Sequence, residues 1–142
     1  MVIITKNTAE TINFGKDLAT KLHGGDIVLL NGDLGAGKTT LMKGLALGLG
    51  IDNEINSPTF TLMNIYSANI RDIKMVAHID TYRLKDEREL TEIGVEDYLG
   101  EDHTLTIIEW PEKIANLLQN KKMIRVKLES LGVNERKIQV FF

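Results

Sequence analysis

The amino-acid sequence predicts an α/β fold in three layers, with helices on both faces of a mostly parallel central sheet and an antiparallel edge at the C-terminal end. Short apolar runs alternate along the chain with stretches of helical periodicity. The run Ile27–Leu30 is continuously apolar and lies between glycine-rich stretches, as is typical of a strand buried on both faces of a parallel sheet. The C-terminal segment instead alternates apolar and polar residues on either side of Gly132–Glu135, which predicts a hairpin.

The composition fits one globular domain spanning residues 1–142, because 43% of the residues are hydrophobic and 26% are charged. Lys and Arg number 17 against 20 Asp and Glu, and a net charge of −3 argues against broad, sequence-blind binding to nucleic acid. The absence of cysteine excludes disulfides, thiolate zinc sites and cysteine nucleophiles. No apolar run is long enough to span a bilayer or to form the core of a signal peptide, so we expect a cytoplasmic protein that does not bind membranes.

The first part of the chain predicts two strand–helix units. Val2–Thr5 suits a short strand, and Thr8–Leu22 suits an amphipathic helix that ends at Gly24 and Gly25. Asp26–Asn31 contains the continuous apolar run and predicts a buried strand. The next helix is expected from Lys38 to about Leu49, because this stretch is rich in Leu, Met, Ala and Lys and runs into glycines.

The rest of the chain predicts further strands and helices in alternation, followed by the hairpin. Pro111 favours a helix start directly after an apolar strand. The expected elements are strands at Thr61–Ser67 and Lys74–Asp80 with a turn near Asn69, a helix at Asp86–Leu99 interrupted or ended near Gly94 and Gly100, a strand at Thr104–Trp110, a helix from Pro111 to about Asn120, and hairpin strands at Met123–Leu131 and Lys137–Phe142.

A phosphate-binding motif lies between the second strand and the second helix. Gly32–Thr39 reads GDLGAGKT and fits G-x-x-x-x-G-K-[ST] without a mismatch. Glycines let backbone N–H groups approach phosphates, and the following helix directs its positive dipole end at them. Lys38 is expected to contact the β- and γ-phosphates and Thr39 to ligate Mg²⁺, with Thr40 near the α-phosphate. The predicted nucleotide-binding residues of the loop are Asp33, Leu34, Gly35, Ala36, Gly37, Lys38, Thr39 and Thr40.

This motif indicates a single-domain P-loop NTPase, since an apolar strand precedes it and a helix follows it. The competing interpretation is a tight strand–helix turn with an incidental lysine. The chain has no N-K-x-D guanine-binding motif, so we expect adenine nucleotides as ligands.

Two acids stand at the carboxyl ends of predicted strands, where open α/β sheets bind ligands: Asp80 and Glu109. Such an acid holds Mg²⁺ or orients the attacking water in a P-loop NTPase. Each acid alone is equally consistent with a solvated strand end, but two beside one P-loop favour a functional role.

The loop Ser57–Thr61 reads SPTFT and occupies the position of a switch loop, in which threonine hydroxyls sense Mg²⁺ and the γ-phosphate. The candidate switch residues are Ser57, Thr59 and Thr61. An ordinary proline turn is the competing interpretation.

Several side chains near the two acids have two open interpretations. Trp110 is either a core residue or, with Tyr82 and Arg83, a stacking or partner surface. Arg83 contacts phosphate or pairs with a nearby glutamate. His78 lies on the same side of its strand as Asp80 and either bonds to the switch loop or is a satisfied structural histidine.

Four motifs occur in order at close spacing: Gly32–Thr40, Ser57–Leu62, His78–Leu84 and Glu109–Glu112. Together they resemble the bacterial TsaE family, the small P-loop ATPases of tRNA threonylcarbamoyladenosine biosynthesis. The resemblance extends from about Thr5 to the C-terminus, although residues after Leu118 match only loosely.

The resemblance implies residue roles. Lys38 and Asp80 would be catalytic, Thr39 and Glu109 would serve Mg²⁺, and Thr8 would lie by the nucleotide base.

The resemblance also implies partners and an activity. The partners would be the TsaD and TsaB proteins, which together install threonylcarbamoyl on adenosine 37 of tRNAs that read codons starting with A. The chain would hydrolyse ATP to drive cycling of that complex without transferring the group, and it would contact tRNA at most indirectly or weakly. We expect slow hydrolysis by the isolated chain, because none of its arginines lies near the P-loop in the sequence.

Two other functions remain open from the residues. A small-molecule kinase is disfavoured, since kinases of this fold usually add an arginine-rich lid and the chain has no such insertion. A nucleotide-gated adaptor without significant hydrolysis differs from the ATPase in not needing Asp80.

Overall fold

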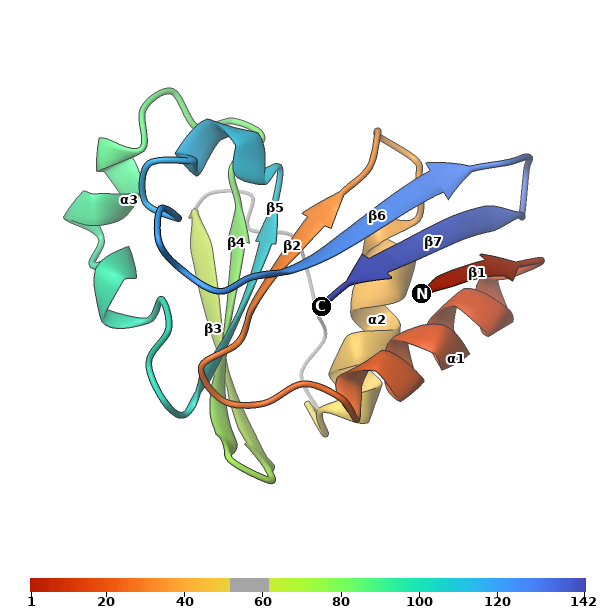
Figure 1. Ribbon diagram of the computed structural model, residues 1–142, viewed down its shortest axis with the longest axis horizontal. Helices are drawn as coiled ribbons and strands as arrows, with labels where there is room; N and C mark the ends of the chain where they lie inside the picture. Colours follow the sequence, from red (N-terminus) through yellow and green to blue (C-terminus); the bar gives the residue numbers. More distant parts are fainter. Residues whose placement is uncertain (52–61) are drawn as a thin grey trace.

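The computed structural model describes residues 1–51 and 62–142 (Figure 1). Within these residues, seven strands form one mixed sheet in the order β1-β7-β6-β2-β5-β4-β3. The strands are β1 Val2–Thr5, β2 Ile27–Asn31, β3 Met63–Ile70, β4 Ile73–Asp80, β5 Thr104–Glu109, β6 Ile124–Ser130 and β7 Arg136–Phe141. The four central strands, β6, β2, β5 and β4, are parallel, and antiparallel partners lie on both sides of them. The predicted parallel centre and antiparallel C-terminal hairpin are confirmed, and β1 forms the edge beyond β7.

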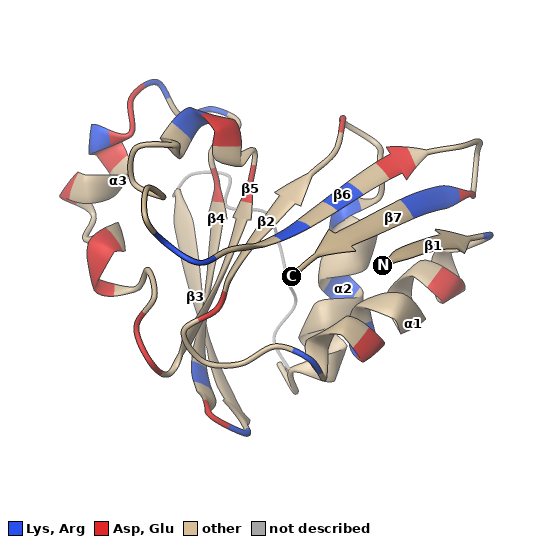
Figure 2. Cartoon of the chain, viewed as in Figure 1, with Lys and Arg blue, Asp and Glu red and all other residues tan. Residues whose placement is uncertain are grey.

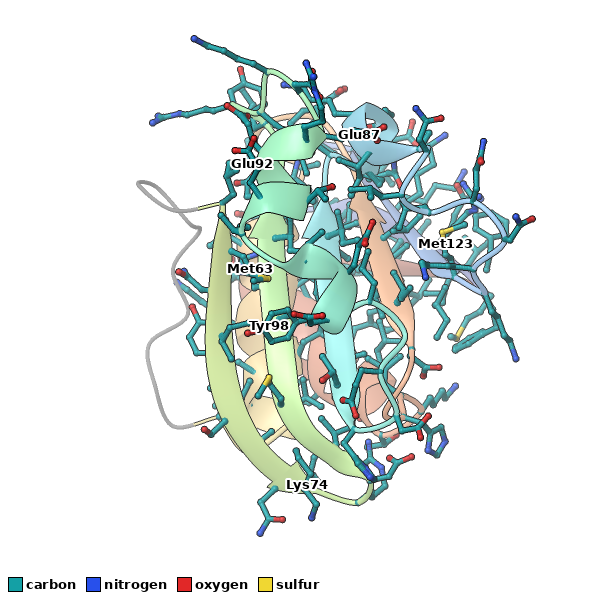
Figure 3. The ribbon with its side chains drawn as sticks, turned by 90° about the vertical axis from the view of Figure 1, so that its left-hand side faces the viewer. Met63, Lys74, Glu87, Glu92, Tyr98 and Met123 are labelled. Atoms are coloured by element: carbon teal, nitrogen blue, oxygen red, sulfur yellow. The ribbon has the colours of Figure 1, made fainter. Side chains whose placement is uncertain are left out.

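Helices cover both faces of the sheet, which confirms the three-layer prediction. The helices α1 (Thr8–Ala19) and α2 (Lys38–Gly48) pack on one face. The opposite face carries α3 (Arg88–Glu92) and the 3₁₀ turns η1 (Val95–Asp97) and η2 (Pro111–Ile114). Figure 3 shows α3 in front of the strands and the long helices behind them.

The apolar run of β2 is continuous because each face of that strand belongs to a different core. Val28 and Leu30 are buried against α1 and α2, whereas Ile27 and Leu29 are buried on the side of α3 and η2. Alternation of side chains along a strand produces this division. Because both faces of β2 are buried, the position of this strand, which leads into the phosphate-binding motif, is held from both sides.

Two predicted helices are much shorter than expected. In place of a helix over Asp86–Leu99, α3 ends at Glu92, because Gly94 adopts the left-handed conformation with φ 84° and starts the separate turn η1. The helix expected from Pro111 to Asn120 is only the single turn η2, followed by turns that end at Asn120 with φ 64°. The predicted interruption near Gly94 is confirmed, whereas the helix predicted from Pro111 to Asn120 was wrong in extent.

The turn between β3 and β4 also lies later than predicted. Arg71 adopts φ 51° and makes the turn at Arg71–Asp72 instead of near Asn69. Its guanidinium donates to the carbonyls of Ala19 and Leu22 at 2.7 and 2.8 Å, which ties the turn to the end of α1.

No helix in the described ranges is long and apolar enough to cross a membrane.

Candidate functional site

The phosphate-binding motif forms the connection between β2 and α2, as its sequence predicts. Gly37 precedes α2 in the left-handed conformation with φ 101°, and within residues 1–51 and 62–142 no side-chain cap hydrogen bond is made at this helix start. Gly35 has φ 80°, a conformation that side chains with a Cβ rarely adopt. The loop therefore leaves backbone donors and the positive end of the α2 dipole available to an anion.

A cavity of about 330 Å³ lies above this loop and gathers most of the predicted site residues. Its lining comprises Leu34, Gly35, Gly37, Lys38, Thr39, Thr40, Asp80, Tyr82, Glu109, Trp110 and Arg136. The predicted loop residues Asp33 and Ala36 line a neighbouring hollow of about 610 Å³ that shares Leu34 and Trp110 with the cavity. The predicted phosphate, metal and acid residues thus converge from three separate segments of the chain.

Lys38 is buried at the floor of the cavity, with 7% of its surface exposed. Its ammonium donates to the carbonyl of Gly32 and lies 3.9 Å from the centre of the Trp110 ring, a cation–π contact. Burial lowers the pKa of Lys38, and the carboxylates of Glu109 and Asp80 oppose that shift.

Trp110 belongs to the cavity wall and is half-buried. It adopts the left-handed conformation with φ 58°, which is unusual for a bulky residue and turns the ring over Lys38. Tyr82 packs against it, with ring centres 5.1 Å apart and planes inclined by 45°. Of its two interpretations, the structure favours a stacking surface at the site over a core residue.

Sheet pairing brings the two predicted acids together. Asp80 and Glu109 are register partners at the carboxyl ends of β4 and β5, and Glu109 also pairs with Leu30 of β2, close to the P-loop. The ends of β4 and β5 are red in Figure 2. Asp80 accepts a hydrogen bond from the backbone N–H of Tyr82 at 3.0 Å.

Glu109 is almost fully buried, with 4% of its surface exposed. Its Oε2 lies 2.8 Å from Nε2 of His78, which is 1% exposed. Sequence reasoning placed His78 on the correct side of its strand but did not identify Glu109 as its partner, because spacing along one strand says nothing about the register with the next.

The donor set fits a cation that arrives with a polyphosphate. Among the described residues, no group of three or more His, Asp or Glu side chains is arranged to hold a metal ion. Thr39 and Glu109 nevertheless line the same cavity. One hydroxyl and one or two carboxylates are typical of Mg²⁺ sites that are completed by phosphate oxygens and water.

Arg136 is a site residue that the sequence analysis missed. Although it lies 101 residues after Gly35, its Nη2 donates to the Gly35 carbonyl at 3.2 Å, and it lines the cavity. Its Nη1 donates to the carbonyls of Gly132 and Glu135 at 3.0 and 2.8 Å. The arginines are distant from the P-loop in the sequence, as stated above, but strand order brings Arg136 beside it, and no local sequence signal indicated this contact.

Two further predicted residues, Thr8 and Arg83, do not line the cavity. Thr8 is exposed and lines a small hollow beside it, together with Thr40, Asn134 and Arg136. Arg83 is exposed and is absent from the cavity lining. The candidate switch residues Ser57, Thr59 and Thr61 lie outside the described residues.

Comparison with known proteins gives consistent similarities. The family model "Threonylcarbamoyl adenosine biosynthesis protein TsaE" matches residues 5–138. Two proteins named "tRNA threonylcarbamoyladenosine biosynthesis protein TsaE" illustrate the sequence similarity. The one from Treponema pallidum is 35% identical over 140 residues, covering 99% of both chains. The one from Synechocystis sp. is 49% identical over 111 residues, covering 75% of this chain and 68% of the relative. The crystal structure of Bacillus subtilis YdiB superposes with a TM-score of 0.78 at 30% identity, covering 97% of this chain and 82% of that one.

Proposed function

The chain belongs to the TsaE family, and from that premise we propose that it is a Mg²⁺-dependent ATPase that acts in the biosynthesis of tRNA threonylcarbamoyladenosine. The observation that carries the proposal is the cavity in which Lys38, Thr39, Asp80 and Glu109 meet above the P-loop. The names of the relatives support the role in tRNA threonylcarbamoyladenosine biosynthesis. The residues that line the cavity support Mg²⁺-dependent hydrolysis of ATP.

The P-loop provides the phosphate site in this proposal. Backbone N–H groups of Gly35–Thr40 bind the phosphate oxygens, helped by the dipole of α2. Lys38 leaves the Gly32 carbonyl and the Trp110 ring to contact the β- and γ-phosphates. The present contacts of Lys38 keep its side chain ordered within the cavity before nucleotide binds.

The two acids have different surroundings and different proposed roles. Glu109 is buried and fixed by His78, and with Thr39 it holds Mg²⁺, which when bound neutralises charge on the phosphates. Asp80 is half-buried and lines the open part of the cavity, where it orients the attacking water.

The proposed partners are the TsaD and TsaB proteins, with hydrolysis driving the cycling of that complex in the cytoplasm and without group transfer by this chain. The side chain of Arg136 is engaged with loop carbonyls, so it does not stabilise charge on a transferring phosphoryl group in this arrangement. We therefore expect slow hydrolysis by the isolated chain and faster hydrolysis with partners. The net charge of −3 supports at most indirect or weak contact with tRNA.

Calorimetry with ATP and ADP, together with phosphate release with and without the TsaD and TsaB proteins, tests the proposal. Lys38→Ala is expected to weaken nucleotide binding at least about tenfold, because it removes a charge-assisted contact to phosphate. Asp80→Ala is expected to retain binding and to lose about 10²–10³-fold in hydrolysis rate. Absence of ATP and ADP binding by the wild-type chain would overturn the proposal, and unchanged hydrolysis by Asp80→Ala would remove the role given to that acid.

A further inference from the structure

We propose that His78 is a positioning residue, which holds the carboxylate of Glu109 in the orientation needed to ligate the nucleotide-bound Mg²⁺. This inference rests on the proposed function, because it assigns a role to His78 at the same site. It concerns a residue that does not line the cavity and that acts through Glu109.

The strand register places His78 directly behind the site. Asp80 and Glu109 are register partners on the parallel strands β4 and β5, so their side chains share a face of the sheet. His78 precedes Asp80 by two residues and therefore shares that face, which is the side of α2. From this position its imidazole reaches across to the neighbouring strand and meets Glu109 at 2.8 Å.

The chemistry of the pair defines what each atom does. An ionised carboxylate only accepts hydrogen bonds, so Nε2 of His78 carries the hydrogen and donates it to Oε2 of Glu109. With Oε2 held in this way, the carboxylate of Glu109 keeps the orientation in which it would ligate the cation. Both side chains are buried, so loss of the imidazole removes the donor that the structure gives to Oε2.

The other ring nitrogen argues against a purely structural role. Nδ1 of His78 is buried and has no hydrogen-bond partner among the described residues. A buried polar atom without a partner costs stability, and that cost is accepted here at a residue whose other nitrogen bonds to Glu109. What an apolar side chain does not provide is a donor to Glu109. Residues that fix a ligating carboxylate from behind typically contribute a factor of about 10–100 to metal affinity.

Two amide substitutions at His78 test the hydrogen-bond donor separately from the volume of the side chain. His78→Gln places an N–H group at about the distance of Nε2, whereas the shorter His78→Asn reaches only the level of Nδ1. The matched control is Thr106→Val, which removes a buried hydroxyl without a partner from β5 and leaves Glu109 untouched.

The readout is ADP affinity measured by calorimetry, once with Mg²⁺ and once with EDTA. The Mg²⁺-dependent gain is the ratio of the ADP affinity with Mg²⁺ to the ADP affinity in EDTA. We expect this gain to be about tenfold smaller in His78→Asn than in wild type, and to stay within about threefold of wild type in His78→Gln and Thr106→Val. ADP affinity in EDTA is expected to be unchanged in all three, which also shows that the P-loop is folded. Equal Mg²⁺-dependent gains in His78→Asn and wild type would overturn the inference.

Nitrogen NMR of the wild-type protein tests the contact without a substitution. The chain has three histidines, and His23 and His103 are exposed, so the buried imidazole is distinguishable. The Nε2 resonance of His78 is expected to shift when Mg²⁺ is added to the ADP complex, and an unmoved resonance contradicts the proposal. Failure of the proposed function is distinguishable from failure of this inference. In that case the wild-type protein binds no ADP, either with Mg²⁺ or with EDTA.

Discussion

At the scale of single residues, the site contains groups whose placement opposes stability. Lys38 is buried, and burial lowers its pKa even though Glu109 and Asp80 oppose the shift. Trp110 adopts a left-handed backbone to cover that lysine. Such costs are expected where a side chain must be ready for a ligand that is bound only part of the time.

Lys38→Met is predicted to raise the free energy of unfolding by about 1 kcal/mol in the absence of nucleotide, because it removes a desolvated charge. The pKa of Lys38 is lower in the folded than in the unfolded chain, so the unfolded chain binds more protons between the two values. Wild-type stability therefore rises with pH through that window, and Lys38→Met lacks this rise. Urea denaturation of both proteins, from neutral pH to about pH 10.4, measures the difference. Parallel pH profiles would contradict the prediction.

At the scale of elements, the contact between α1 and α2 sets the position of the P-loop. The two helices approach closely through glycines. A Cβ at Gly44 would lie 2.2 Å from the carbonyl oxygen of Ile12, and one at Gly15 would lie 2.7 Å from that of Leu41. Because α2 begins directly at the P-loop, this contact also determines where its first turn points.

Gly44→Ala is therefore predicted to destabilise the protein by about 3 kcal/mol, since the clash is with backbone and the helices must separate. ADP affinity is expected to fall as well, because the first turn of α2 moves. Thermal unfolding and calorimetry measure the two effects. Gly132→Ala is the control: a Cβ there has no atom within 4 Å, and its unfolding is expected to match wild type.

At the scale of the whole molecule, the strand order brings the C-terminal hairpin to the site. β6 pairs with β2 and β7 with β6, so the end of the C-terminal hairpin lies beside the loop that follows β2. Arg136 completes this connection by donating to the Gly35 carbonyl. The hairpin is thus connected to the P-loop by a hydrogen bond.

Arg136→Ala is predicted to speed hydrogen exchange of the loop amides between residues 33 and 37, because it removes the contact that holds the Gly35 carbonyl. Exchange within β2 is expected to remain as in wild type. Lys137→Ala, on the next residue of β7, is the control for loss of a positive charge. Equal loop exchange in both variants would show that Arg136 does not brace the loop.

Local sequence determined much of the fold and of the site. The motif Gly32–Thr39 specifies its own turn and helix start, because glycine conformations and a following helix are short-range properties. The apolar runs of β2 and β5 indicated buried parallel strands. Local sequence also indicated the break near Gly94, but it did not determine the length of the segment after Pro111, where only the single turn η2 forms.

The sequence alone was enough to predict that a loop with the phosphate-binding motif is followed by two strand-end acids, Asp80 and Glu109. The contacts that support this site come from the tertiary structure alone: His78 meets Glu109, Trp110 covers Lys38, and Arg136 donates to the Gly35 carbonyl. The physical reason is that these contacts depend on strand order and register, which arise from burial of both sheet faces across the whole chain and leave no local pattern.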